Sequence, residues 1–495
     1  MPDATQESRA SKDAGRLVSG RLGFGCYRVD DETPDHRAAL GLALASGCRL
    51  IDTSTNYTDG ASERLVGEVL EDLARRDRAA RAAVTVVSKI GYVQGRNLDL
   101  AIERERSGRP FPEMVRYMDG CWHCIHPEFL RDQLTRSRER LRLETLDVCL
   151  LHNPEYFLSD AKKRHERDLE GVRAEFYRRL RDAFAFLEEA ARRGEIRAYG
   201  VSSNTAVVRP GDPEATSVSR MLEAAVQAGG PGHRFRVLQI PMNLFESGGA
   251  LTRNTGPGGR QTALEAAAAA GLEVLINRPL NAFVGQRLMR LADPPGASPE
   301  ATLDELLARI QGLEKEYRAD IAPSLPAGAG GASADQLFEL VEQVAGLSDQ
   351  VEDFVHWQQI EQQYVIPRIN LMVGTLARHL PAEARERWRV WWDRYLPALH
   401  GLLGEVGRSA AVKGRRQSGA VAAAIDPLLP EERRRETLSR KALWVLASTP
   451  GVGCVLVGMR RPAYVQDALG MLGWPPLDDP LAVYRRLSDA TDVPA

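Results

Sequence analysis

The sequence predicts an α/β fold, a (β/α)8 barrel of the TIM type, with an all-helical insertion after the seventh strand. Short apolar, β-branched runs alternate with longer helix-periodic segments through most of the chain, and eight such runs occur. Nearly continuous apolar strands indicate burial on both faces of a parallel sheet. Eight strand-and-helix units favour a closed barrel over an open, doubly wound sheet.

The predicted strands are residues 21–25, 48–54, 84–90, 146–153, 196–203, 236–243, 272–280 and 453–459. A helix is expected over 34–46, because Thr33 is a good cap, Pro34 suits the first helical position and Gly47 suits a left-handed stop. Another is expected over about 170–193, where apolar residues recur at helical spacing before Gly194.

The regular alternation stops after residue 282. No strand-like run is expected between 283 and 436, whereas helical patterns cover 302–318, 334–365 and 382–404, and the Gly/Ala/Pro-rich stretch 323–333 is typical of a linker. We expect Trp388, Trp391 and Trp392 to lie in a helix-bundle core, with a substrate-facing aromatic wall as the alternative. An insertion after a barrel strand emerges at the face that carries active sites, so the block is interpreted as a lid or an interaction module.

The domain organisation follows from these patterns. Residues 16–282 and 437–482 are expected to form the barrel, and 283–436 the insertion. Residues 1–15 are expected to be a flexible N-terminal tail, and 483–495 a C-terminal tail.

The composition excludes several classes of protein. Hydrophobic residues make up 43% and charged residues 27%, as in soluble globular proteins. A net charge of −2 does not suggest a nucleic-acid-binding face. Six irregularly spaced cysteines do not form a disulfide framework, and neither a signal peptide nor an apolar run of 18 residues is present. We therefore expect a cytoplasmic protein that contacts no membrane or nucleic acid.

Four residues at the predicted strand ends form a candidate catalytic group. Asp52, Lys89 and His152 end the second, third and fourth predicted strands, and Tyr57 follows Asp52 by five positions. Each residue alone has a simpler explanation, as a cap, a solvated charge or a structural histidine. Because strand ends converge at the mouth of a barrel, however, the combination predicts a proton-transfer site.

The chemistry of such a site requires a cation next to the tyrosine. The ordinary pKa of tyrosine, about 10, makes it a poor proton shuttle at neutral pH unless a nearby charge favours the phenolate. Lys89 is expected to supply that charge, and Asp52 to keep the buried lysine charged. His152 is expected to orient a carbonyl oxygen or to take part in the proton transfer.

The segments "DTSTNY", "VVSKI", "LDVCLLHNPE", "IRAYGVSSN" and "GVGCVLVGMRRPAYVQDAL" resemble, in this order, motifs of the aldo-keto reductases. The resemblance covers roughly residues 16–282 and 437–480. It implies that Asp52, Tyr57, Lys89 and His152 are the catalytic tetrad, with Tyr57 protonating a carbonyl oxygen. It also implies NADPH, less often NADH, as the cofactor, bound extended and without a Rossmann fold.

The same resemblance implies a set of cofactor-binding residues. Ser202, Ser203 or Asn204, together with Gln239, would hold the nicotinamide carboxamide, and Gly25 and Cys26 would line the cofactor groove. The turn at Gly458, Met459 and Arg460 would receive the adenosine 2′-phosphate, with Arg461 as a second candidate, which favours NADPH over NADH. The sequence departs from the family at Thr58, at Asn277, where relatives often stack an aromatic ring on the nicotinamide, and at Ala468, where they often carry an Asn. Arg278 is therefore expected near the pyrophosphate and Gln466 near the adenine.

A second cluster follows the third predicted strand, in "MDGCWHCIHPEF". Cys121, Cys124, His123 and His126 are potential zinc ligands, but they crowd within six residues, unlike the separated ligand pairs of structural zinc sites. Zinc and a redox pair of cysteines are both disfavoured, and no metal is expected. We interpret the segment as an active-site loop in which Trp122 or His123 contacts substrate or simply packs.

Three functions are compatible with the sequence. The favoured one is an NADPH-dependent oxidoreductase that reduces an aldehyde, ketone or sugar carbonyl, or catalyses the reverse reaction. The alternative is a catalytically weak, NADPH-binding regulatory protein that uses the helical insertion as a docking module for an unknown partner. An isomerising or eliminating enzyme with the same proton-transfer site is the third. Substrate identity and oligomeric state cannot be inferred from the sequence.

Overall fold

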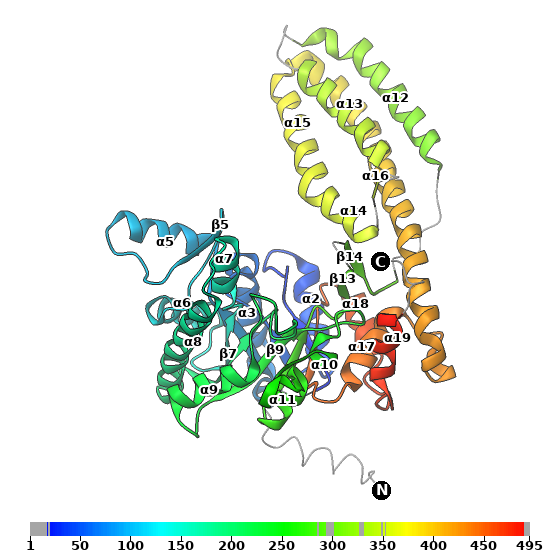
Figure 1. The fold of residues 1–495 in the computed structure, drawn as a ribbon. Helices are drawn as coiled ribbons and strands as arrows, with labels where there is room; N and C mark the ends of the chain where they lie inside the picture. The colour runs from blue at the N-terminus through cyan, green and yellow to red at the C-terminus, as the bar shows by residue number, and fades with distance from the viewer. Residues whose placement is uncertain are drawn as a thin grey trace. The chain divides into compact units, whose positions relative to one another are not determined.

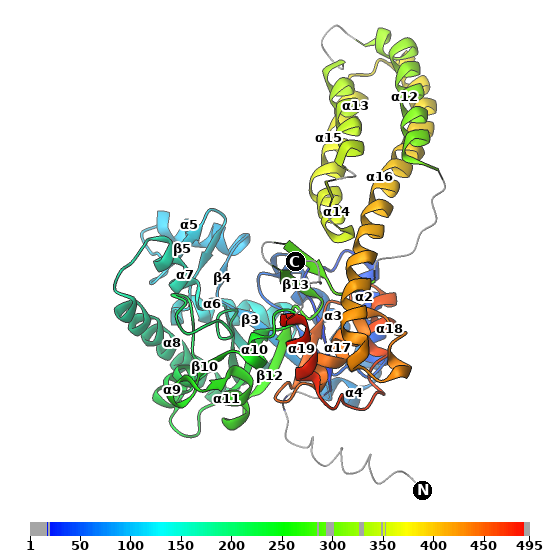
Figure 2. The same cartoon turned by 45° about the vertical axis from the view of Figure 1, so that its right-hand side comes forward.

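The computed structural model describes residues 17, 20–284, 287–293, 301–325, 331–347, 350, 351 and 353–489. The chain divides into two compact units, one formed by the chain up to Leu288 and from Leu428 onward, the other by Met289–Pro427. Figures 1 and 2 show the first unit as strands surrounded by helices and the second as a group of helices. The tail predicted for residues 1–15 lies outside the described residues.

The first unit is a closed barrel of eight parallel strands, which confirms the predicted fold class (Figure 1). Around the barrel the strands follow the order β1, β15, β12, β9, β8, β7, β3, β2. They are β1 (Leu22–Gly25), β2 (Leu50–Asp52), β3 (Thr85–Ile90), β7 (Leu146–His152), β8 (Ile196–Ser202), β9 (Phe235–Pro241), β12 (Glu273–Asn277) and β15 (Cys454–Val457). The barrel interior holds a core of Leu50, Val87, Val148, Leu150, Val237, Leu275, Cys454 and Leu456.

Helices connect and surround these strands. They are α2 (Pro34–Ala45), α3 (Ala61–Arg76), α4 (Arg78–Ala82), α5 (Arg96–Arg106), α6 (Pro127–Leu141), α7 (Tyr156–Lys163), α8 (Leu169–Arg192), α9 (Val218–Gly229), α10 (Gly248–Leu251), α11 (Ala263–Ala269), α17 (Leu438–Ser448), α18 (Pro462–Leu469) and α19 (Pro480–Asp489). Both helices predicted in the first half of the barrel are confirmed, as α2 and α8. Pro34 opens α2 and Gly47 has a left-handed φ of 92°, but Thr33 makes no side-chain cap.

Short strands form small sheets in the loops of the barrel unit. The loop after β3 forms a three-stranded sheet of β4 (Tyr92–Val93), β6 (Cys121–His123) and β5 (Val115–Met118). Short strands β10 (Arg253–Thr255) and β11 (Gln261–Thr262) pair near α11. None of these strands was expected, because runs of two to four residues carry too little periodicity to be recognised.

The C-terminal tail predicted from residue 483 is wrong for 483–489. These residues belong to α19, and Val483 and Tyr484 are fully buried. The hydroxyl groups of Tyr484 and Thr449 lie 2.7 Å apart in a buried hydrogen bond, so the segment is part of the barrel unit. The rest of the predicted tail lies outside the described residues.

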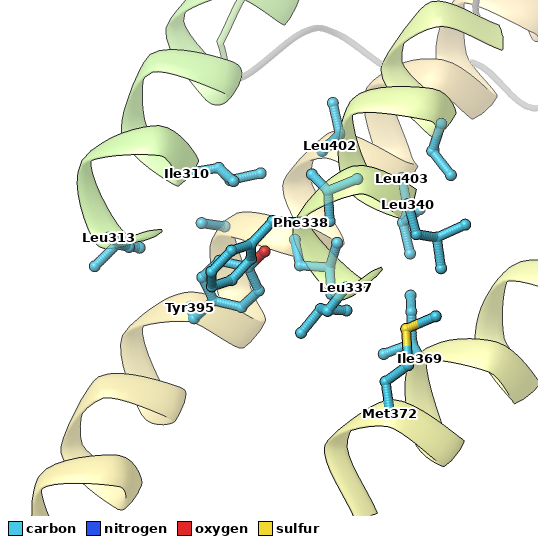
Figure 3. Close-up of a cluster of buried hydrophobic side chains, with 14 of the residues drawn as sticks. Ile310, Leu313, Leu337, Phe338, Leu340, Ile369, Met372, Tyr395, Leu402 and Leu403 are labelled. Carbon is cyan, nitrogen blue, oxygen red and sulfur yellow. The ribbon is translucent and has the colours of Figure 1, made fainter. Parts of the chain in front are cut away.

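The second unit is a bundle of α12 (Leu303–Asp320), α13 (Gly331–Gly346), α14 (Phe354–Ile360), a π-helical turn at Glu361–Val365, α15 (Ile366–His379) and α16 (Ala382–Ile425). Helix α12 packs on α16 and α13 on α15. Figure 3 shows part of its core, in which Leu337 and Phe338 of α13 meet Tyr395 and Leu402 of α16. Trp388 and Trp391 belong to this core and Trp392 packs against it, as predicted.

Three expectations for this region need correction. The described residues of 283–436 are not free of strands, since β13 (Asn281–Val284) and β14 (Arg287–Arg290) form a hairpin at its start. The single helix predicted over 334–365 is interrupted, because α13 ends at Gly346 before α14 begins. Helix α16 continues to Ile425 and tolerates Pro397 in its interior. Among the described helices, none is both long and apolar enough to traverse a bilayer.

Candidate active site

The four predicted catalytic residues lie together at the carboxyl ends of adjacent strands. Asp52 ends β2, Lys89 is the penultimate residue of β3 and His152 ends β7. The register aligns Lys89 with Leu150 of β7, so the ends of the two strands lie side by side. Tyr57 opens a short turn, in which Thr58 and Asp59 both have positive φ, and this tight turn brings its ring back toward β3.

Lys89 is the centre of the group. Its ammonium donates to Asp52 Oδ2 at 2.7 Å, to the Thr53 carbonyl at 2.8 Å and to the Tyr57 hydroxyl at 3.0 Å. The side chain is 0% exposed, so all three donors of the ammonium are used inside the protein.

The Asp52–Lys89 pair is charged. Burial lowers the pKa of Lys89. Asp52 and Tyr57 raise it by more than burial lowers it, so the net shift is upward. Burial raises the pKa of Asp52, yet both of its carboxylate oxygens accept N–H donors, from Lys89 and from Gln239 at 2.8 Å. An N–H donor on each oxygen favours the ionised carboxylate.

The tyrosine is a neutral donor in this environment. Burial raises the pKa of Tyr57, Lys89 lowers it and Asp52 raises it, and the net shift is upward. The expectation that Lys89 would bring the phenol closer to ionisation is therefore wrong for the net effect, although Lys89 acts in the expected direction. Tyr57 keeps its proton at neutral pH and is able to donate it.

His152 is a neutral imidazole. Burial, then the charge of Lys89 and then His123, hold its pKa well below the ordinary value. Its Nδ1 lies 3.0 Å from Ser54 Oγ, and its ring is edge-on to Tyr57 and Tyr92, with centroids 5.9 and 4.6 Å away. Within the described part of the chain, Nε2 makes no hydrogen bond, which leaves it available to a bound molecule.

Gln239 supports Asp52. Besides its bond to Asp52, its Oε1 accepts from Ser202 at 3.1 Å and from Asn277 at 3.2 Å. The side chain is 1% exposed. That Gln239 also holds a carboxamide stays a prediction, with its amide oxygen and one amide N–H engaged by these neighbours.

Of the three residues predicted at the end of β8, only Asn204 has an exposed side chain. Ser202 is bound to Gln239, and Ser203 is buried with its Oγ 3.1 Å from Thr216 Oγ1. The backbone N–H of Asn204 donates to Glu155 Oε1 at 2.6 Å. Asn204 is thus the residue of the three that is free to hold a carboxamide.

Gly25 and Cys26, predicted to line a groove after β1, lie close to the end of β15. A Cβ at Gly25 would lie 3.4 Å from the Val457 carbonyl, so the two strand ends approach closely. Cys26 is 0% exposed, and burial strongly raises the pKa of its thiol. Its side chain therefore cannot line an open groove, although its backbone lies at the strand end.

An arginine cluster stands at the ends of β1 and β15. Arg28, Arg460 and Arg461 form no ion pair in the described regions, although arginines elsewhere in the chain are commonly paired with carboxylates. Burial, followed by the charges of Arg28 and Arg461, lowers the pKa of Arg460. Gly458 is exposed beside them, whereas Met459 is buried. Like charges held together without counterions fit a phosphate-binding site.

The other residues considered for cofactor binding differ in their burial and in their hydrogen-bond partners. Arg278 pairs with Glu246 at 2.8 Å, and its Nε is buried without a partner. Asn277 also has a buried Oδ1 without a partner. Gln466 is exposed on α18. Unsatisfied buried atoms such as these fit a site that is completed by a polar ligand.

The Cys and His cluster after β3 does not converge. His123 is 1% exposed and its Nε2 lies 2.7 Å from the His152 carbonyl, while the His126 side chain caps α6. Both cysteines are free, with burial raising the pKa of Cys124 to about 12. In the described regions, no group of three potential ligands is arranged to hold a metal.

The two residues that were predicted to contact substrate, His123 and Trp122, differ in their exposure. His123 is buried and contacts the backbone at the end of β7, which favours packing over a substrate contact. Trp122 is half-buried on β6 beside Arg116, whose guanidinium lies 5.0 Å from the ring centroid. Trp122 therefore remains a candidate for contact with a ligand.

The sequence analysis did not identify several residues that lie near the site. Tyr27 is 59% exposed and edge-on to Tyr57, with ring centroids 5.3 Å apart. Tyr92 contacts both His152 and His123. Ser54 lies inside the Asp-to-Tyr motif, yet its bond to His152 joins residues 98 positions apart. Only a correct strand order would have brought these pairs together.

Comparisons with known proteins match part of the chain to one family. Residues 21–210 match the family model of the aldo/keto reductase family. D-threo-aldose 1-dehydrogenase from a Pseudomonas species is 28% identical over 201 residues, which are 38% of this chain and 52% of that protein. The chain thus spans about half the length of this relative.

Solved structures resemble the chain at low identity. Glycerol dehydrogenase from Gluconobacter oxydans is 17% identical, with a TM-score of 0.46 over 97% of this chain and 94% of that one. An aldo/keto reductase from Klebsiella pneumoniae, in complex with NADP and acetate, is 19% identical, with a TM-score of 0.32 over 52% of this chain and 64% of that one.

Proposed function

We propose that this chain is an NADPH-dependent oxidoreductase of the aldo/keto reductase type that interconverts a small-molecule carbonyl and the corresponding alcohol, which the match of residues 21–210 to that family's model supports. The substrate class is an aldehyde, a ketone or a sugar carbonyl. One observation carries the proposal. The Lys89 ammonium contacts the Tyr57 hydroxyl at 3.0 Å and Asp52 at 2.7 Å, in a buried site at the strand ends.

The mechanism starts from the protonation states of these residues. Tyr57 is neutral and donates a hydrogen bond, and then a proton, to an oxygen bound in front of it. The oxygen of Tyr57 accepts from Lys89, so negative charge that develops on the phenol is stabilised by a cation that is already in place. Asp52 holds that cation, and Gln239 holds Asp52. When bound, the nicotinamide cofactor supplies or accepts the hydride.

Residues at two ends of the predicted cofactor path support the choice of NADPH. We propose that Asn204, whose side chain is exposed, holds the carboxamide and that the backbone at Gly25 lines the cofactor groove. Arg28, Arg460 and Arg461 supply positive charge without carboxylate partners. A 2′-phosphate would provide the missing negative charge, which supports NADPH over NADH.

The experiment that tests the proposal is a fluorescence titration of the full chain with NADPH and NADH, followed by a panel of carbonyls and alcohols. Tyr57→Phe removes only the hydroxyl, so cofactor affinity should be kept while turnover falls by about 10²–10⁴. Tyr364→Phe, which removes a hydroxyl of a half-exposed ring in the helical unit, is the matched control and should leave turnover unchanged.

The opposite results would contradict the proposal. Turnover that survives in Tyr57→Phe would remove Tyr57 from the chemistry. NADPH binding without turnover of any compound would favour the alternative, a cofactor-sensing protein whose helical unit holds a partner.

Two further points belong to this proposal. The helical block, expected over 283–436, is proposed to shape access of substrates to the barrel, because it follows the strand that ends at Asn277. A cytoplasmic location is supported by six cysteines that are all free and buried.

A further inference from the structure

Glu155 is a buried carboxylate that the proton-transfer group described above does not use. It follows His152, the last residue of β7, and its side chain is 3% exposed. Among the described residues it forms no ion pair, and its Oε2 is buried without a hydrogen-bond partner. Buried charges in proteins are normally paired, so a buried carboxylate without a cation is unusual.

The other buried carboxylates that the structure describes in the barrel unit do have cationic partners. They are Asp52 with Lys89, Glu63 with Arg140, Asp147 with Arg197 and Glu188 with Arg234, at N–O distances of 2.7–3.6 Å. Burial raises the pKa of Glu155 against the effect of its hydrogen bonds, as expected for a carboxylate that no cation stabilises. Glu155 therefore departs from the pattern of its own unit.

The Glu155 carboxylate lies where the ends of β7 and β8 meet. Its Oε1 accepts from the backbone N–H of Asn204 at 2.6 Å and from Asn153 Nδ2 at 3.0 Å. The backbone N–H of Asn153 donates to the Ser202 carbonyl at 2.8 Å, which ties the two strand ends together. Asn204 is the residue proposed to hold the nicotinamide carboxamide, so Glu155 directly contacts the proposed nicotinamide site.

The two forms of a nicotinamide cofactor differ by one charge on the ring. The oxidised ring is a cation and the reduced ring is neutral, whereas the phosphate groups are the same in both forms. The Lys89 ammonium is already paired with Asp52 at 2.7 Å, so this pair adds no net charge to the site. A carboxylate beside the ring therefore stabilises the oxidised form selectively.

We propose that Glu155 supplies the counter-charge for the oxidised nicotinamide ring, so that the site favours NADP⁺ over NADPH more than it would without this carboxylate. The inference rests on the proposed function and deepens it, because it concerns the direction of the reaction. Selective binding of NADP⁺ favours alcohol oxidation. In that direction the alcohol carbon gives a hydride to NADP⁺ and the hydroxyl group gives up its proton, which leaves the carbonyl compound and NADPH.

The test compares the Kd values for NADP⁺ and NADPH, measured by isothermal titration calorimetry on the full chain. Glu155→Gln removes the charge but keeps an oxygen that accepts from Asn204. We expect the ratio of the Kd for NADP⁺ to the Kd for NADPH to rise about tenfold, the equivalent of a shift of one pKa unit. Glu170→Gln makes the same change at an exposed position of α8 and should leave the ratio unchanged.

Glu155→Asp makes the opposite change. It keeps the charge, but its side chain is one methylene shorter and loses the contact to Asn204. Both Kd values should therefore rise by a similar factor, and their ratio should stay within about twofold of the wild type. Melting temperatures show whether each variant folds. That of Glu155→Gln should not fall, because an amide costs less to bury than a charge without a partner.

Two results would overturn the inference. One is a Kd ratio in Glu155→Gln that equals the wild-type ratio. The other is a ratio that rises equally in Glu155→Gln and Glu155→Asp, which would assign the effect to the position of the loop instead of the charge. If the wild type binds neither cofactor, the inference and the proposed function both fail. If it binds and turns over but the ratio does not change in Glu155→Gln, only the inference fails, so the two failures are distinguishable.

Discussion

At the scale of single residues, the Asp52–Lys89 pair predicts a stability effect that is separable from catalysis. Lys89→Met removes the ammonium but keeps most of the side-chain volume, which leaves the Asp52 carboxylate buried beside an apolar group. Breaking a buried pair in this way typically costs about 3–5 kcal/mol in the free energy of unfolding. We expect a loss of that size in urea unfolding, together with a loss of turnover.

The double variant Asp52→Asn with Lys89→Met is the control for this prediction. It removes both charges, so most of the stability should return while turnover stays lost. If Lys89→Met alone unfolds at the wild-type urea concentration, the pair is not a buried, charged pair.

His123 predicts the pH dependence of stability. Burial lowers its pKa from 6.5 to about 4, outweighing the bond to the His152 carbonyl, so the folded protein binds its proton less readily than the unfolded chain. Between these pH values the unfolded chain is protonated and the folded protein is not. Stability therefore falls as the pH drops below 6.5, by up to about 1.4 kcal/mol per pH unit for this group.

His123→Phe keeps a ring between Tyr92 and Tyr156 but cannot titrate. The midpoint of urea unfolding, measured between pH 7.5 and 5, should fall less steeply in His123→Phe than in the wild type. His152 shifts in the same direction, so some slope remains in the variant. Parallel slopes in the two proteins would contradict the prediction.

The residues of the site differ in how far they could be predicted. The positions of Asp52, Lys89 and His152 could be predicted because each stands at a strand end, and that of Tyr57 because it follows Asp52 in the same motif. The role of Gln239 could not, because its bond to Asp52 joins residues 187 positions apart. A local motif gives the residue type at a strand end, but not which neighbour across the barrel uses its donors.

At the scale of elements, strand β8 predicts a strong effect of a single methyl group. A Cβ at Gly200 would lie 1.9 Å from the Val237 carbonyl of β9, and backbone atoms at that distance cannot move aside within a barrel. We expect Gly200→Ala to destabilise the protein by at least the ~1–3 kcal/mol typical of overpacking. The melting temperature and the urea midpoint both measure this effect.

Gly41 is the matched control for this substitution. It lies in α2, is exposed, and has nothing within 4 Å of its Cβ position. Gly41→Ala should stabilise the helix by ~0.5–1 kcal/mol, because alanine has less conformational freedom to lose. If Gly200→Ala and Gly41→Ala changed the stability equally, the close approach of β8 and β9 would be absent.

Elements with continuous apolar runs could be predicted, and those defined by tertiary contacts could not. All eight barrel strands were recognised from their apolar, β-branched runs, because burial on both faces demands apolar residues throughout. The segment 483–489 has few apolar residues and appeared to be a tail. It is helical because Val483 and Tyr484 pack on the barrel unit, which is a contact that no local pattern encodes.

At the scale of the whole molecule, the chain consists of two units with separate cores. The barrel unit contains all the proposed catalytic and cofactor-binding residues. The helical unit has its own core, in which Tyr317, Phe338, Trp391 and Tyr395 pack at centroid distances of 4.5–6.1 Å. A boundary near 283 and 436 was predicted from the loss of strand patterns, and the compact helical unit covers Met289–Pro427.

This division predicts that cofactor binding and substrate choice respond differently to removal of the helical unit. A variant in which a short Gly/Ser linker replaces residues 289–427 keeps every proposed contact to NADPH. Its Kd for NADPH should therefore stay within about twofold of the wild type, because only small, indirect effects on the barrel remain. If the block shapes access to the site, the ratio of kcat/KM for a bulky carbonyl to that for a small one should change. The NADPH titration also shows whether the barrel still folds without the helical unit. If NADPH binding is intact and the ratio of the two kcat/KM values is unchanged, the helical unit does not control substrate access.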